Sequence, residues 1–96
     1  MIVEFSKQAA ADLRKIAADI RAFGNSIAAA VGLRIRETIT LIAQFPQAGM
    51  RIADKPGIRV IPLTRYPDKI FYRVLEDRIR ILHIRHSSRR PWTKER

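Results

Sequence analysis

Residues 69–81 have the sequence KIFYRVLEDRIRI, in which two β-prone segments flank the polar pair Glu76-Asp77. Within each segment apolar side chains alternate with charged ones, which is the pattern of a strand with one buried face. A polar pair between two such segments favours a tight turn. We therefore expect a β-hairpin of residues 69–75 and residues 78–85, which places a sheet in the C-terminal half of the chain.

Two further strands are expected in this sheet. Residues 58–63 come just before the hairpin, and Tyr66-Pro67-Asp68 forms the turn that connects them to it. Short turns between consecutive strands favour an antiparallel meander. Residues 2–5 form a short opening strand that joins the sheet either at an edge or in the middle. The stretch that follows Pro46-Gln47-Ala48-Gly49, up to Pro56-Gly57, is irregular and rich in turn-forming residues.

Two amphipathic helices are expected between the first strand and the others. The first has Ser6 as its N-cap and runs to about Phe23, where Gly24 ends it. The second runs to about Gln44, and its N-cap is Asn25 or Ser26. Each helix has one apolar stripe: Leu13, Ile16, Ala17 and Ile20 in the first, and Ile27, Val31, Ile35, Ile39 and Ile42 in the second.

These elements predict one α+β domain over residues 1–96. A chain of 96 residues is too short for two cores of useful size, and nothing in it marks a linker. The expected architecture is a two-layer β-α-α-β-β-β fold, with an N-terminal helical hairpin packed on one face of a mainly antiparallel sheet.

The charge balance predicts an anionic partner. The chain has 19 Lys and Arg against 9 Asp and Glu, a formal net charge of +10. Such a field steers acidic proteins or nucleic acids toward the surface. Cysteine is absent, which excludes disulfides, thiolate metal sites and Cys nucleophiles. The sequence has neither a membrane-spanning stretch nor a signal-peptide pattern, so a cytoplasmic location is expected.

Strand alternation predicts that the open face of the sheet, turned away from the helices, is basic. If the wholly apolar sets of side chains face the helices, Ile61 and Phe71 add apolar patches to this open face. The alternation fails near Leu82, which indicates either a β-bulge or a covered far face. The basic residues expected together there are Arg59, Lys69, Arg73, Arg78 and Arg80.

The titratable residues offer few other sites. His83 and His86 are three apart in a strand, so they point to opposite faces and do not predict a metal site. His83 is expected to be partly buried. His86 is either a general acid or base in RNA cleavage or a turn residue with local hydrogen bonds. Ser87 and Ser88 have no plausible triad partners.

The acidic residues of the first helix predict no special chemistry either. Asp12 and Asp19 are expected on its exposed surface, with weak local pairing to Lys15 and Arg21. Among the groups of residues considered, only the cluster of arginines and lysines suggests a chemical role. It either stabilises a phosphorane during RNA cleavage, or binds an acidic partner and catalyses nothing.

The chain resembles the RelE/ParE superfamily of bacterial type II toxins, which are small basic partners of acidic antitoxins. The resemblance covers nearly the whole chain. It is carried by the order and spacing of the following segments: Ile42-Ala43-Gln44-Phe45-Pro46, Ala48-Gly49-Met50-Arg51, Gly57-Ile58-Arg59, Tyr66 to Val74, and Ile79 to Arg89.

This resemblance implies a toxin with one of two targets. ParE-like members poison DNA gyrase without nuclease activity, whereas RelE-like members are ribosome-dependent mRNA endonucleases. The Ala-Gly-x-Arg turn at residues 48–51 and the His-x-x-Arg-Arg ending at residues 86–90 are more similar to the ParE branch. We therefore expect a ParE-like gyrase inhibitor, with the mRNA endonuclease as the alternative.

The endonuclease alternative implies specific catalytic positions. Lys69 stands where nucleases usually have a catalytic Arg, Arg89 matches a second phosphate-stabilising Arg, and Arg59 is near a position that nucleases fill with Lys. No Tyr follows Arg89, and Trp92 is the only aromatic residue of the tail, so proton transfer falls to His86.

The resemblance and the charge together imply a complex with an acidic antitoxin that folds on binding. No cofactor or metal is implied. A DNA- or RNA-binding module unrelated to toxicity is a third class of function. The residues expected to bind the target or the antitoxin are Arg51, Arg59, Arg73, Arg80, Arg89, Arg90 and Trp92.

Overall fold

A computed structural model describes residues 1–86 of the chain. Two helices follow the first strand and precede the other four. The elements in chain order are β1 (Ile2–Phe5), α1 (Lys7–Arg21), α2 (Asn25–Gln44), β2 (Met50–Arg51), β3 (Ile58–Pro62), β4 (Asp68–Val74) and β5 (Arg78–His86).

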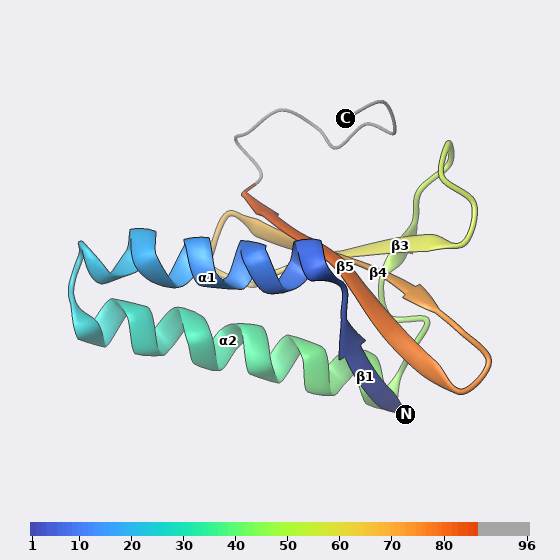
Figure 1. Cartoon of the computed structure of the whole chain (residues 1–96). Helices are drawn as coiled ribbons and strands as arrows, with labels where there is room; N and C mark the ends of the chain where they lie inside the picture. Colours follow the sequence, from blue (N-terminus) through green and yellow to red (C-terminus); the bar gives the residue numbers. More distant parts are fainter. Residues whose placement is uncertain (87–96) are drawn as a thin grey trace.

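The five strands form one mixed sheet in the order β1-β5-β4-β3-β2. β1 is parallel to β5 at one edge, and the other neighbouring strands are antiparallel. The helices lie side by side and run in opposite directions along one side of this sheet (Figure 1). The predicted α+β architecture is confirmed, and the opening strand takes the edge rather than the middle.

Local sequence explains where the helices begin and end. The hydroxyl of Ser6 accepts a hydrogen bond from the Ala9 N–H at 3.0 Å, which caps α1 as predicted. Gly24 has a φ of 118°, which favours glycine, and it occupies the N-cap position of α2. No side chain caps α2, so the prediction of Asn25 or Ser26 as its N-cap is wrong, and α2 already begins at Asn25.

The core lies between the helical hairpin and the sheet. Its largest fully buried side chains come from α2 and the central strands, and several side chains of the α1 stripe pack against it. Burying this apolar surface is the main force that holds the two layers together. The largest fully buried side chains are Tyr72, Ile42, Ile70, Ile79 and Ile81.

A β-bulge at Leu82 explains why the alternation in β5 fails. Tyr72 lies opposite Ile81 and Phe71 lies opposite His83, so Leu82 has no partner in β4. One extra residue reverses the alternation beyond it. Ile84 is buried for this reason, and the first of the two explanations offered by the sequence is confirmed.

The predicted orientation of β3 is wrong. Arg59 lies opposite Tyr72 and Ile61 opposite Ile70, and residues directly opposite on neighbouring strands share a face. Tyr72 and Ile70 face the core, so Arg59 and Ile61 are on the helix side of the sheet. Ile58 is on the open side.

Ile58 is nevertheless buried, because the chain before it folds back on it. Its N–H donates to the Lys55 carbonyl at 3.1 Å, and its carbonyl accepts from the Ile52 N–H at 3.2 Å. An apolar residue on the open face is therefore covered without a helix.

The irregular stretch before β3 contains a strand that the sequence did not predict. β2 has only two residues, Met50 and Arg51, which pair with Val60 and Arg59 at the far edge of the sheet. Within residues 1–86, neither helix is both long enough and apolar enough to cross a membrane.

Candidate functional site

Five basic side chains of the described residues share the open face of the sheet. We call four of them the basic face: Lys69 and Arg73 of β4, and Arg78 and Arg80 of β5. The fifth, Arg85 of β5, lies opposite Lys69. Lys69 and Arg73 alternate with the buried residues of β4, and Arg73 lies directly opposite Arg80. The residues of the basic face are four of the five that the alternation predicted to lie together. They concentrate positive charge where no helix covers the sheet.

Glu4 of β1 neutralises one side of the basic face. Its carboxylate forms ion pairs with Arg78 at 3.1 Å and with Arg80, its direct partner across the parallel strands. Hydrogen bonds from Arg80 and then Arg78 lower the pKa of Glu4. Asp77 also pairs with Arg78 at 3.0 Å, and these contacts raise the pKa of Arg78.

Lys69 and Arg73 are the part of the basic face that remains available to an external anion. Among the carboxylates of residues 1–86, none forms an ion pair with either side chain. Arg73 is exposed, and its guanidinium passes close to Gly57, where an added Cβ would lie 3.5 Å from Nη1. Phe71 lies between Lys69 and Arg73 on the same face and adds a partly buried ring.

Arg59 is separated from the basic face and has a structural partner. Its Nη1 donates to the Gly49 carbonyl at 2.8 Å and, at 3.4 Å, to the Gln47 carbonyl. Arg51 lies opposite Arg59 on the same side of the sheet and is exposed. A shallow hollow of about 630 Å³ lies beside Arg59, lined by residues 44–48 and Val74.

Sequence comparison assigns the chain to a family. Residues 3–91 match the family described as "ParE toxin of type II toxin-antitoxin system, parDE". The match covers most of the 96 residues and includes every strand and helix described above, except Ile2 at the start of β1. This chain belongs to the ParE toxin family. Among curated protein sequences, none matches this chain.

Solved structures agree with the assignment to ParE. A chain from "Chromosomal ParDE TA system from P. aeruginosa" is 30% identical, with a TM-score of 0.78 over 90% of this chain and 95% of that one. The isolated E. coli RelE toxin has a TM-score of 0.67 at 14% identity, covering 93% and 86% of the two chains. A chain of the intact E. coli RelBE toxin-antitoxin complex has a TM-score of 0.67 at 14% identity, covering 92% of this chain and 98% of that one. The similarity to these two E. coli structures shows that the fold is shared.

The other residues that the sequence predicted for the functional site of this ParE toxin lie in its C-terminal segment, from His86 onward. His86 is the last residue of β5 and pairs with Asp68 of β4. The predictions for Ser87, Ser88, Arg89, Arg90 and Trp92 lie outside the described residues. Lys69 and Arg59 are two of the four residues expected to catalyse RNA cleavage, and the strand pairing places them on opposite sides of the sheet.

Sequence reasoning missed the role of Asp12 in this ParE toxin. Its carboxylate accepts a hydrogen bond from the Ile84 N–H at 3.0 Å and lies 3.4 Å from Nδ1 of His83, so it is not an ordinary surface residue. His83 is partly buried, as expected. Burial lowers its pKa, and this effect is larger than the opposing effect of Asp12. The pairing predicted for Asp19 is present, at 3.6 Å from Lys15.

Proposed function

We propose that this ParE toxin inhibits DNA gyrase and that an acidic antitoxin neutralises it. Family membership supports a toxin of a type II system, and the chain shares 30% identity with a chain of a ParDE system. The observation that carries the choice of target is the position of Arg59. It lies on the opposite side of the sheet from Lys69 and contacts the Gly49 carbonyl.

This separation argues against a RelE-like active site. Cleavage of RNA by attack of its own 2′-hydroxyl needs cationic groups arranged around a single phosphate, together with a group that transfers the proton. Arg59 and Lys69 do not face a common phosphate, because β3 and β4 present them on different faces. Non-catalytic binding to gyrase requires no such convergence.

The basic face supports an acidic antitoxin as the partner. Lys69, Arg73 and the exposed parts of Arg78 and Arg80 present cations around Phe71, which suits a chain with both acidic and apolar side chains. In a protein with a net charge of +10, such a partner also relieves self-repulsion. We infer a hetero-oligomer whose stability falls as the salt concentration rises.

The test combines the purified toxin with gyrase, supercoiled plasmid and ATP. Linear DNA covalently linked to gyrase should accumulate and should disappear when the antitoxin is added. Arg73→Glu should weaken the reversal by the antitoxin, because it reverses a charge on the basic face. Arg36→Glu on α2 is the matched control, since Arg36 is also exposed and lies outside the basic face.

Unaffected gyrase would overturn the proposal. In that case the same preparation is assayed for cleavage of mRNA on translating ribosomes. Cleavage that Lys69→Ala abolishes would assign the protein to the RelE-like alternative despite the position of Arg59.

A further inference from the structure

A cavity of about 360 Å³ lies on the helix side of the sheet, away from the basic face. The turn of the helical hairpin, the β3–β4 turn and β5 all contribute to its wall. Its lining is mostly apolar and includes Ile16 and Ile20 of α1, Val31 of α2 and Ile84 of β5. The volume is within the range of roughly 300–1,000 Å³ that is typical of small-molecule sites. The cavity is therefore large enough for a small organic ligand.

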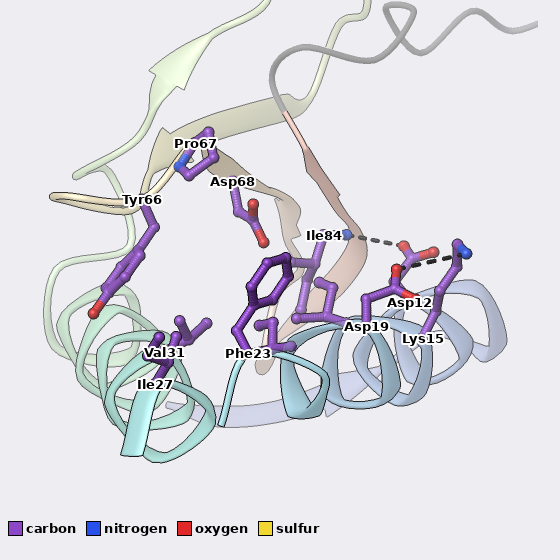
Figure 2. A pocket seen from close by; sticks show the side chains of 12 residues that line it. Asp12, Lys15, Asp19, Phe23, Ile27, Val31, Tyr66, Pro67, Asp68 and Ile84 are labelled. Carbon is purple, nitrogen blue, oxygen red and sulfur yellow. Dashed lines mark hydrogen bonds and ion pairs between the residues drawn. The ribbon is translucent and has the colours of Figure 1, made fainter. Parts of the chain in front are cut away.

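Two aromatic rings line this cavity from different elements. Figure 2 shows Phe23, from the turn between the helices, on one side of the open space and Tyr66, from the β3–β4 turn, on the other. Phe23 is 74% exposed, so its ring does not belong to the packed core. An ammonium group near the face of an aromatic ring is attracted by the electron density of that ring. These rings thus suit a ligand that carries a cation on an apolar body.

The charge around the cavity is opposite to that of the whole protein. The carboxylates of Asp12, Asp19 and Asp68 line it, and among the described residues Lys15 is the one cation that does so. A third of the chain's nine acidic residues is gathered here, in a protein with a net charge of +10. Such a lining attracts cations and repels anions at close range.

Lys15 and His83, which lie beside two of these carboxylates, neutralise the lining only in part. Lys15 is 3.6 Å from Asp19 and supplies one charge against three. His83 is beside Asp12, but burial lowers the pKa of His83, so its ring is largely uncharged at neutral pH. Distant Lys and Arg side chains are screened, because the Debye length is about 8 Å at physiological ionic strength. A cation inside the cavity therefore experiences mainly the carboxylates around it.

We propose that this cavity is a binding site for a small organic amine with an aromatic or branched apolar body. The apolar body lies against Val31 and Ile84. The ammonium group lies between Asp68 and Phe23, where Figure 2 shows the carboxylate pointing toward the ring. Because the cavity and the basic face are on different sides of the sheet, this inference depends neither on the proposed target nor on the antitoxin.

The test titrates the ¹⁵N-labelled full chain with 2-phenylethylammonium chloride at neutral pH. The backbone amide shifts should change in a saturable manner, and the changes should cluster around Phe23, Ile27 and Ile84. Two probes with the same phenyl body isolate the charge. The neutral 2-phenylethanol should bind about ten-fold more weakly, because it lacks the charge-assisted contact. The anionic 3-phenylpropanoate should leave the amides of the cavity unchanged.

Two matched pairs of variants locate the site. Asp19→Asn should weaken binding of the ammonium probe several-fold, and Glu37→Gln should not, although both remove a carboxylate that is about half exposed and paired on a helix. Phe23→Ala should also weaken it several-fold, and Phe45→Ala should not, although Phe45 is 61% exposed. All four side chains are exposed, so native circular dichroism is expected throughout. Asp68→Asn removes the carboxylate that points toward Phe23 and should weaken binding more than Asp19→Asn.

Four results would overturn the proposal. The first is the absence of saturable changes in the cavity amides with both 2-phenylethylammonium and cyclohexylmethylammonium chloride. The second is equal affinity for the ammonium probe and the alcohol, which would mean that charge does not select the ligand. The third is an equal effect of each variant and its control, because the probe would then bind elsewhere. The fourth is a change of the same amides when the free protein is diluted, which would mean that a second copy of the chain occupies the cavity.

Discussion

The N–H of Gly49 donates a hydrogen bond to the Tyr72 hydroxyl at 2.8 Å, and a Cβ at Gly49 would lie 2.7 Å from that same oxygen. The hydroxyl in turn donates to the Pro46 carbonyl at 2.8 Å. A buried side chain of the central strand β4 thus fixes both ends of the loop between α2 and β2. Glycine is required because no larger residue fits against the ring.

Tyr72→Phe should lower the free energy of unfolding by about 1–3 kcal/mol, because it leaves the Gly49 N–H and the Pro46 carbonyl without their partner. Urea unfolding measures the change. Tyr66→Phe is the control: the Tyr66 hydroxyl makes no hydrogen bond to any part of the chain that the structure describes, so its loss should have little effect. Equal losses in the two variants would contradict the role given to Tyr72.

The same hydroxyl predicts a loss of stability at alkaline pH. Burial raises the pKa of Tyr72 above its ordinary value of 10.0. The folded protein therefore keeps a proton that the unfolded chain loses, and stability falls as the pH rises above about 10. Wild-type protein should lose more stability than Tyr72→Phe over this range in urea titrations at successive pH values. Parallel curves would show that other groups cause the loss.

Asp12→Ala should destabilise the protein by about 1–3 kcal/mol, because the Ile84 N–H at the edge of β5 loses its acceptor. Asp12→Asn retains an acceptor oxygen and should recover part of this loss. Asp19→Ala removes a carboxylate from the same helix, where it forms an exposed pair with Lys15, so about 0–1 kcal/mol is expected. Thermal unfolding of the three variants would refute the assignment if Asp19→Ala were the most damaging.

His83 should make the protein sensitive to mild acid. Burial lowers its pKa below the ordinary 6.5, with Asp12 opposing and Arg85 adding to the effect. The unfolded chain then takes up a proton before the folded one does, so this contribution is present above about pH 6.5 and is lost as the pH falls through the lower folded value. His83→Gln should flatten the pH dependence of the unfolding midpoint in this range. An unchanged slope would exclude His83 as its source.

Glu4→Gln should increase affinity for polyanions. The substitution frees Arg78 and Arg80 from their shared carboxylate. The variant should elute from heparin at a higher salt concentration than Glu37→Gln, which changes the net charge equally but removes only the exposed pair with Arg34 on α2. Identical elution of the two variants would show that net charge alone determines the binding.

The order and type of the elements other than the two-residue strand β2 could be predicted from the sequence, but the face of β3 could not. Ile58, Val60 and Ile61 are all apolar, so the alternation in this strand fits either orientation. The burial of Ile58 by the chain before it and the pairing of Arg59 with Tyr72 decide the orientation. Both are tertiary contacts, and the alternation of residues within a single strand carries no information about them.

The role of Asp12 was unpredictable for a related reason. Helical spacing identifies neighbours three or four residues away, and it correctly gave the pairing of Asp19 with Lys15. The partner of Asp12 is 72 positions away, on an edge of β5 that becomes free where β1 ends. By contrast, the bulge at Leu82 could be anticipated, because it leaves a visible break in the alternation.

The parallel pairing of β1 with β5 has a consequence for biosynthesis. β1 has only one neighbour in the sheet, and that neighbour, β5, is translated after every other strand of residues 1–86. Glu4 and Arg80 meet only after nearly the entire chain has emerged. A nascent polypeptide therefore lacks the completed sheet until β5 has been made, and β1 waits without a partner while β2, β3 and β4 are synthesised.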